Sequence, residues 1–418
     1  MFRALNSARR KSSHFALAIA LAGGGVFGSA MMASPVAAQE QAQPSQGFGT
    51  VFNEIIPLIQ GETQNFASAQ AMLPRLEAAI ENNVDREMAG RVLVAIGNGV
   101  NDRQLQRRGI AMRLESGRTP AEEIGVLNWY AGNFAIEVDD YGAARQYLNA
   151  ARQAGYTPEQ TDLVNLIART YLEENNDRGA YDFLTAAIAE TDAAGNRVPE
   201  AWLRNTLQFT YEEGMMAETQ DTILRLIRDY PGQQSWSDGL RISAQMLELS
   251  DDARVDLYRL MAVKGALVDR PYLTDYIETI DPRLMSNEVL DVLRIGVTND
   301  VFQTSGDSYY AEVNGIAEAR APVDRRGIGG IISEGRNGDA LDAKNAGDVL
   351  FSLDDYAQAL QMYNLAKERG FDADAINMLI GINQAMQGDN AAAEASFSAV
   401  GGERAPVAAL WKAHVASQ

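Results

Sequence analysis

The chain has 418 residues, of which 46% are hydrophobic and 22% charged, an ordinary globular composition that excludes a disordered or collagen-like chain. It contains no cysteine, which excludes disulfide frameworks, zinc–thiolate sites, iron–sulfur clusters and thiol catalysis. Its formal net charge of −20 repels nucleic acid and anionic lipid surfaces, so we expect no nucleic-acid partner.

Residues 1–38 have the pattern of an export signal. A basic start at 3–11 contains no acidic residue, and an apolar stretch follows at 15–33. Small residues at 35–38 then provide the kind of site that signal peptidase cleaves. We therefore predict a cleaved signal peptide; the competing hypothesis is a retained transmembrane anchor. Cleavage would remove basic residues only, and a more acidic chain favours basic or neutral partners.

The segment after the signal, residues 39–47, is polar and is predicted to be a flexible leader. Beyond it, no stretch approaches the ~18 continuous apolar residues of a membrane span. We expect no integral membrane segment once the signal has been removed.

A shift of 34 residues superimposes two segments near the C-terminus. The shift pairs Gly347 with Gly381, Ala359 with Ala393, and Tyr363 with Phe397. The glycines would let two helices of a hairpin approach closely, and the alanines would lie where these helices cross. The aromatic rings would fill the seam toward the neighbouring hairpin. Gly132, Ala144 and Leu148 fit the same template in an earlier segment.

These segments, residues 344–400 and 126–190, resemble the tetratricopeptide repeat family, whose units are helix–turn–helix hairpins with a period of 34 residues. Leu350 and Gln384 depart from the family pattern, which usually has tyrosine there. The resemblance implies a right-handed superhelix whose groove holds a peptide or protein segment. The whole chain resembles exported tetratricopeptide proteins of Gram-negative bacteria, which implies a periplasmic location.

We therefore predict an all-α fold, an α-solenoid of tetratricopeptide-like hairpins with a degenerate middle segment. The predicted organisation is an N-terminal helical array at 48–232, a degenerate segment at 233–343, a C-terminal hairpin pair at 344–402 and a capping helix at 403–418. Within the degenerate segment we expect helices at 236–249, 253–263 and 286–297. Glycine-rich residues 304–338 are expected to be partly loop, and the segment to form a hinge between two solenoid arms.

Catalytic signals are sparse. The sequence has two histidines, and His14 falls in the predicted signal, which leaves His414 as the one candidate imidazole base. Its place near the end of the chain predicts a surface residue of the terminal helix. Acidic pairs such as Asp139-Asp140 and Asp354-Asp355 precede predicted helices, where carboxylates cap free backbone amides. We predict no catalytic residue, no cofactor and no metal site, and expect that the protein is not an enzyme.

Three pairs of polar or aromatic residues lie on the faces that would line a binding groove, on the first helix of each hairpin. These groove candidates are Trp129 with Asn133, Asn165 with Arg169, and Lys344 with Asp348. Such side chains can hydrogen-bond a peptide backbone or a terminal carboxylate. The alternative is that each is simply a solvated surface residue.

Three functional hypotheses follow. The leading one is an exported interaction scaffold that binds other envelope proteins or peptides through its groove. The second is a carboxylate-dependent hydrolase of peptidoglycan or another cell-wall polysaccharide, or an accessory factor of such an enzyme, because acidic residues are plentiful. The third is a structural component or homo-oligomer.

Overall fold

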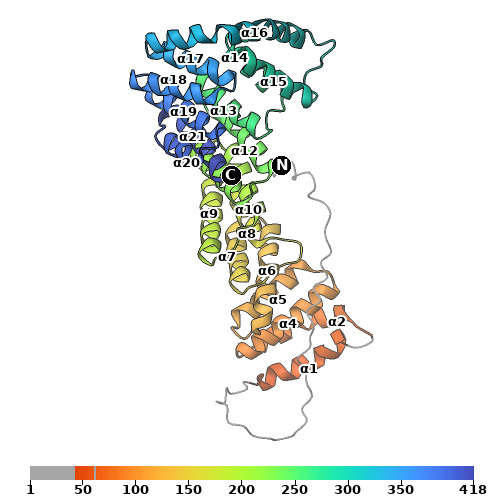
Figure 1. Cartoon of the computed structure of the whole chain (residues 1–418). Helices are drawn as coiled ribbons and strands as arrows, with labels where there is room; N and C mark the ends of the chain where they lie inside the picture. Colours follow the sequence, from red (N-terminus) through yellow and green to blue (C-terminus); the bar gives the residue numbers. More distant parts are fainter. Residues whose placement is uncertain (1–42, 61–62) are drawn as a thin grey trace, which may run out of the picture. The chain divides into compact units, whose positions relative to one another are not determined.

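The computed structural model describes residues 43–60 and 63–418, and throughout these residues the regular elements are helices (Figure 1). The predicted all-α fold is confirmed for this part of the chain, in which no strand occurs. The predicted signal peptide, 1–38, lies outside the described residues, and the predicted leader is described only from residue 43. None of the described helices combines the length and apolar character that a membrane span requires.

The chain divides into two compact units, with the boundary between Ala187 and Ile188. The first unit contains α1 (Gln46–Gln60), α2 (Phe66–Ala71), α3 (Leu73–Ala78), α4 (Asn83–Gly99), α5 (Arg103–Glu115), α6 (Ala121–Glu137), α7 (Tyr141–Gln153), α8 (Leu163–Glu173) and most of α9 (Asp177–Ala193). From α4 to α8, each helix packs on the next one along the chain. These helices therefore form a sequential stack of the solenoid kind.

The second unit contains the remaining helices. They are α10 (Glu200–Glu212), α11 (Met216–Asp229), α12 (Gln233–Met246), α13 (Asp251–Val263), α14 (Arg270–Ile280), α15 (Ser286–Thr298), α16 (Ser308–Asn337), α17 (Ala340–Ser352), α18 (Tyr356–Glu368), α19 (Ala373–Met386), α20 (Asn390–Ser398), a short 3-10 turn (Gly402–Arg404) and α21 (Ala405–Ala416). The helices predicted at 236–249, 253–263 and 286–297 are confirmed as α12, α13 and α15.

The acidic pairs begin helices, as predicted. Asp140 accepts a hydrogen bond from the Ala143 amide at 3.1 Å at the start of α7, and Asp355 accepts one from the Gln358 amide at 3.1 Å at the start of α18. The first residue of each pair, Asp139 or Asp354, has a positive φ of 60° or 61°. Because aspartate tolerates this left-handed conformation, one residue makes the turn and the next caps the helix.

The repeat glycines lie where paired helices touch. A Cβ atom on Gly347 of α17 would lie 2.5 Å from Cε1 of Tyr363 in α18, and one on Gly381 of α19 would lie 2.6 Å from Cε1 of Phe397 in α20. The predicted close approach within each hairpin is thus confirmed. Tyr363 packs against Gly347 of its own hairpin, and Phe397 also stacks on Trp411 of α21, the following helix.

The expectation of a partial loop at 304–338 holds only for residues 304–307 and 338, because residues 308–337 form α16, a continuous helix of 30 residues. Asp307 caps its start, and Arg325 and Asp324 bond to the start of α15. Gly335 allows close contact with α17, since a Cβ atom there would lie 2.5 Å from that of Ala346. The turn-like composition misled the prediction because these tertiary contacts hold a segment of weak helix propensity.

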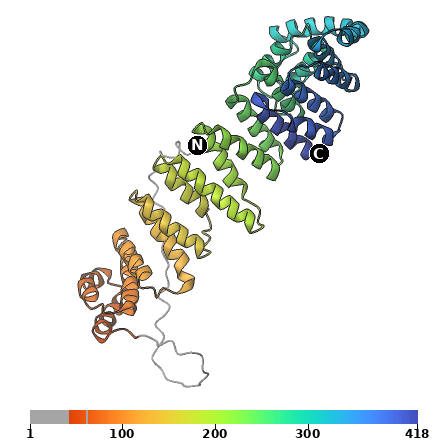
Figure 2. The ribbon, with the colours of Figure 1, turned by 90° about the vertical axis from the view of Figure 1, so that its left-hand side faces the viewer.

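The C-terminal helices fold back onto the start of the second unit. Helix α21 packs on α11 and α13, and α19 packs on α13 (Figure 1). The indole N–H of Trp411 donates to the Asp256 carbonyl at 2.9 Å, and the Gln220 amide donates to the Pro406 carbonyl at 3.3 Å. Figure 2 shows the same helices, α19–α21 in dark blue, beside α12 and α13 in green. Residues 233–343 therefore belong to one compact unit with the C-terminal hairpins and do not form a hinge between separate arms.

This packing also overturns the surface assignment of His414. The residue is 8% exposed, and its ring lies 6.3 Å from the Trp236 ring and 5.7 Å from the Trp411 ring, measured between centroids. Burial, with the charge of Lys264 nearby, lowers the pKa of His414 to about 4. The imidazole is therefore a neutral packing residue of α21 rather than a solvent-exposed one.

Candidate functional site

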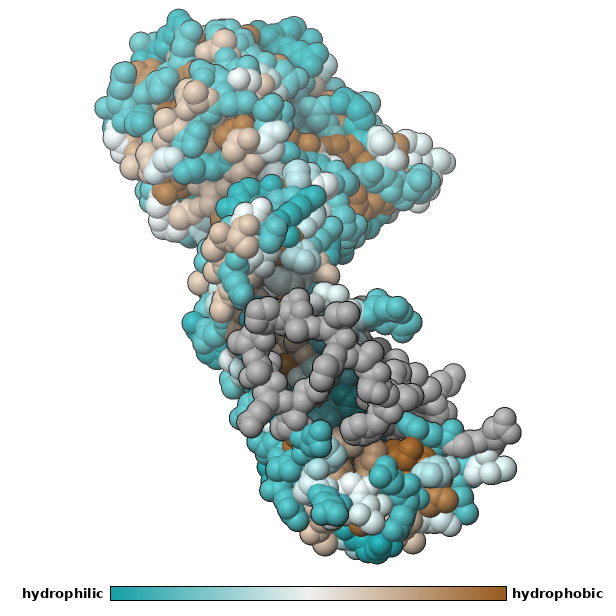
Figure 3. All heavy atoms as spheres, turned by 90° about the horizontal axis from the view of Figure 1, so that it is seen from below, coloured by the Kyte–Doolittle hydropathy of each residue, from teal (hydrophilic) through white to brown (hydrophobic). Residues whose placement is uncertain are grey.

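The second unit contains a cavity of about 480 Å³ that is open to solvent on one side, within the range of about 300–1,000 Å³ typical of small-ligand sites. Residues of α13, α14, α16, α17 and α19 line it, together with Arg404 of the 3-10 turn. On the face shown in Figure 3, by contrast, hydrophobic residues lie as small patches among hydrophilic ones. We therefore take this cavity as the candidate site.

Part of the cavity wall is apolar. The apolar lining residues that are themselves almost fully buried are Val255, Ile280, Met285, Ala346 and Leu379. They come from α13, α14, α17, α19 and the segment before α15. A wall of this kind releases ordered water when an apolar group enters it, which favours binding.

Charged residues line the rest of the cavity, and its cations are all paired with carboxylates. The contacts are Arg259 with Glu288 at 2.8 Å, Arg283 with Asp281 at 3.5 Å, Arg320 with Asp324 at 2.8 Å, Lys344 with Asp348 at 2.7 Å, and Arg404 with Asp256 at 3.2 Å. The buried or half-buried pairs of Arg259, Lys344 and Arg404 hold these cationic side chains in place before any ligand arrives.

Asp256 is the most buried carboxylate of the wall, with 2% of its surface exposed. Burial raises its pKa to about 6, although the neighbouring Arg259 and Arg404 act in the opposite direction. Its carboxylate and carbonyl both bond to the C-terminal part of the chain, through Arg404 and Trp411. Asp256 thus joins the cavity wall to the closing helix α21.

Two of the six groove candidates, Lys344 and Asp348, line this cavity. They lie one helical turn apart on α17 and bond to each other at 2.7 Å, and the Tyr363 hydroxyl donates to Asp348 at 2.9 Å. Burial lowers the pKa of Lys344, but the charge of Asp348 outweighs this and the net pKa is raised. Lys344 is therefore a stable cation within the wall.

The other four candidates lie in the first unit. Trp129 is 8% exposed and packs in a hydrophobic cluster with residues of α7 and α8, so it belongs to the core. The Asn133 amide donates to the Trp129 carbonyl one turn earlier at 2.7 Å. On α8, Asn165 is in the first turn, and the exposed Arg169 forms an ion pair with Glu173 at 3.2 Å.

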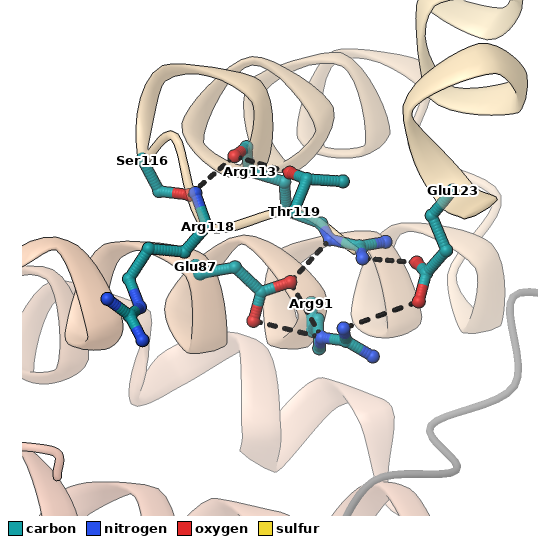
Figure 4. Close-up of polar contacts among 7 residues, drawn as sticks. All are labelled: Glu87, Arg91, Arg113, Ser116, Arg118, Thr119 and Glu123. Carbon is teal, nitrogen blue, oxygen red and sulfur yellow. Dashed lines mark hydrogen bonds and ion pairs between the residues drawn. The ribbon is translucent and has the colours of Figure 1, made fainter. Parts of the chain in front are cut away.

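The first unit also contains a cluster of charged side chains that the sequence did not predict. Arg113 of α5 has no exposed side-chain surface and bonds to Glu87 of α4 and Glu123 of α6. Arg91 of α4 contacts the same two glutamates at 2.8 and 3.3 Å (Figure 4). The four side chains alternate in charge and tie three successive helices together, so we interpret them as a structural network. An isolated sequence gives no pairing signal for charges on separate helices.

The cavity itself was also missed as a unit. Asp252 lies in the acidic first turn of α13 and Arg404 in a short turn without a sequence motif, so neither stands out in the sequence. Both reach the cavity because residues about 150 positions apart come together, as in the Arg404 and Asp256 ion pair. Local periodicity contains no information on such contacts.

A shallow depression of about 320 Å³ lies on α10 and α12, the first helices of successive hairpins. The Arg204 guanidinium bonds to Asp238 at 2.9 Å, and the Tyr211 hydroxyl to Gln245 at 2.7 Å. These bonds satisfy the polar groups of the depression internally, so we rank it below the cavity. Among the described residues, no group of three or more histidine and acidic side chains is arranged to hold a metal ion.

In comparisons with known proteins, no protein-family model and no curated protein matches the chain.

Proposed function

We propose that the protein is an exported interaction scaffold of the tetratricopeptide type, which holds a segment of a partner protein in the cavity of its second unit. The observation that carries this proposal is the cavity itself, with an apolar wall and cations already fixed by carboxylates. Preorganised walls of this kind lower the entropic cost of binding.

Binding is favoured over hydrolysis by the state of the cavity carboxylates. A glycosidase needs one carboxyl group that delivers a proton and another placed near the sugar ring. Asp256 has the raised pKa of an acid, yet it is 2% exposed and accepts a hydrogen bond from Arg404. Asp324 and Asp348 are likewise engaged with cations. The two remaining exposed carboxylates, Asp252 and Glu334, lie on different helices at the solvent side of the cavity, so neither has the buried setting that raises the pKa of a general acid. We therefore propose recognition rather than cell-wall hydrolysis.

The family assignment within this proposal rests on the hairpins. Two glycines 34 residues apart, Gly347 and Gly381, both lie where the paired helices of a hairpin touch. Gly132 lies in the same position of an earlier hairpin, where a Cβ atom would come within 2.6 Å of Leu148. The recurrence of one crossing geometry at a family-like period supports a tetratricopeptide-type repeat.

Photo-crosslinking in intact cells tests the scaffold. A benzoylphenylalanine at Asn345, an exposed residue of the cavity, is compared with one at Glu318, an exposed residue of α16 that does not line it. We expect adducts with a defined partner segment from position 345 only, mapped by mass spectrometry. Filling the cavity with Val349→Trp should remove them. Equal adducts at both positions, or none at position 345, would contradict the proposal.

Export is tested separately by the N-terminus of the protein recovered from the envelope fraction. Cleavage after the small residues at 35–38 predicts a chain that starts near Gln39. An intact N-terminus in a membrane fraction would favour the anchor hypothesis instead.

A further inference from the structure

We propose that the cavity of the second unit selects a cationic segment, a stretch of peptide in which lysine or arginine adjoins an apolar residue. This inference rests on the proposed scaffold function and names the chemistry of its ligand. It follows from which charges of the cavity are already neutralised and which are not.

The cations of the cavity are neutralised from within the protein. Each of the five cationic lining residues has a carboxylate within 4.0 Å, as described above. Even the two most exposed of these cationic side chains form ion pairs, Arg283 with Asp281 and Arg320 with Asp324. An anionic ligand would meet cations whose charge is already largely compensated, so its electrostatic gain would be small.

Two carboxylates of the cavity, by contrast, have no cation paired with them among the described residues. Asp252 in the first turn of α13 and Glu334 near the end of α16 are exposed, and neither carboxylate has an ion pair or hydrogen bond within the described part of the chain. A third, Asp342, bonds only to the Asp339 amide as part of a helix cap. The unbalanced charge of the cavity is therefore negative.

Asp252 is close enough to the interior to act on it electrostatically. Its charge contributes to raising the pKa of both Asp256 and Lys344, although burial is the main influence on Asp256. A cation bound beside Asp252 would thus sit between solvent and the ion-paired wall. Long lysine and arginine side chains suit such a boundary, because the aliphatic stem lies on apolar surface while the charged group stays near water.

The apolar wall accounts for the second part of the recognition. Val255, Ile280 and Leu379 are buried residues that still line the cavity, so an aliphatic neighbour of the cation can be desolvated against them. Asn345, exposed on α17 and also in the lining, can bond to a peptide backbone. Charge, apolar surface and an amide together describe a peptide rather than a free amine.

The test uses three fluorescein-labelled, capped peptides that differ only at two positions flanking leucine, where they carry lysine, glutamine or glutamate. Fluorescence anisotropy measures their binding to the whole exported chain. We expect the lysine peptide to bind about tenfold more tightly than the glutamate peptide, and its affinity to fall with added salt. The double variant Asp252→Asn, Glu334→Gln should weaken lysine-peptide binding about fivefold to tenfold.

The matched control is Glu312→Gln, Glu318→Gln, which removes the same charge from exposed positions of α16 outside the cavity. It should leave the lysine-peptide affinity within about twofold. Equal binding of the three peptides, abolished by Val349→Trp, would overturn the cationic preference and leave the scaffold standing. A lysine preference unchanged in Asp252→Asn, Glu334→Gln would overturn its assignment to this cavity. No binding at all, with no crosslinked partner at position 345, would overturn both proposals.

Discussion

The two units use the same kind of element in different ways. From α4 to α8 the first unit is a stack in which each helix packs on the next, whereas in the second unit α21 returns to α11 and α13. In a simple stack, stability is close to a sum of local terms between neighbours. In the second unit, bonds such as that between Gln220 and Pro406 span 186 residues and make the first helices depend on the last.

The difference also explains where the cavity lies. Its wall includes α13 from the first half of the second unit and Arg404 from near the end of the chain, joined by the Arg404 and Asp256 ion pair. Helical hairpins alone do not supply such a site, because a stack presents open faces. The packing of the C-terminal helix α21 on α11 and α13 therefore brings distant helices together around a cavity. Variants that weaken this packing should affect both ends of the contact.

The largest effect is expected from Trp411→Ala. Trp411 is fully buried, stacks on Phe397 and donates to the Asp256 carbonyl. Its loss should cost about 3–5 kcal/mol and loosen α21 together with α11 and α13. Hydrogen exchange read by mass spectrometry should show faster exchange in both places. Trp129→Ala in the first unit is the control, and its effect should stay within α6 to α8. Faster exchange confined to α21 in Trp411→Ala would contradict this packing.

Buried arginines give the next comparison. Arg259→Met leaves the buried Glu288 with a hydrogen bond from Tyr276 but no cation, so we expect a loss of about 3–5 kcal/mol at pH 7. Arg113→Met should cost less, about 1–3 kcal/mol, because Arg91 still contacts both glutamates of its network. Urea unfolding measures both.

The stability of Arg259→Met should also depend on pH. In the native protein burial raises the pKa of Glu288, but Arg259 more than offsets this and the net pKa is lowered. Without Arg259 the buried carboxyl should favour its protonated form, so Arg259→Met should recover stability between pH 7 and pH 5 relative to the native protein. An equal loss at both pH values would show that packing, not charge, dominates the effect.

What the sequence predicts and what it does not can be seen in particular residues. Gly347 and Asp355 were placed correctly because their roles, a helix crossing and a helix cap, depend on neighbours within one hairpin. His414 was misplaced because its environment depends on Trp236, which is far away in the chain. Residues 308–337 were misjudged because α16 is held by tertiary contacts that composition does not report.

The residues of the candidate site also differ in whether the sequence could identify them. Lys344 and Asp348 were selected from helical spacing and do line the cavity, whereas Trp129, chosen by the same rule, is a core residue. Helical spacing identifies a face but cannot tell whether another helix covers it. The unpaired carboxylates of Asp252 and Glu334 could only be recognised once all the ion pairs around them were known.

A smaller effect is expected at the repeat glycines. Gly347→Ala places a Cβ atom 2.5 Å from the Tyr363 ring and should cost about 1–3 kcal/mol through overpacking. Gly330→Ala on α16 is the matched control, because a Cβ atom there meets no other group within 4 Å. It should stabilise α16 by about 0.5–1 kcal/mol, since alanine favours the helix. Thermal unfolding compares the two. A Gly347→Ala variant as stable as the native protein would contradict the tight crossing.

The smallest effect concerns pH and the end of α21. The pKa of His414 is lowered to about 4 in the folded chain, below its ordinary value of about 6.5, so the unfolded chain binds more protons between these pH values. The contribution of neutral His414 to stability is complete above about pH 6.5 and is lost as the pH falls toward 4.

Asp256, whose pKa is raised to about 6, acts in the opposite sense, because its contribution is present at low pH and is lost as the pH rises through 6. The pH dependence of the unfolding free energy of the native protein therefore combines opposing contributions from His414 and Asp256. Subtracting the unfolding free energy of the His414→Gln variant isolates the contribution of the histidine. That difference in unfolding free energy should shrink as the pH falls from 7 to 4. A constant difference would mean that His414 is protonated alike in both states, and that α21 does not bury it against Trp236 and Trp411 in solution.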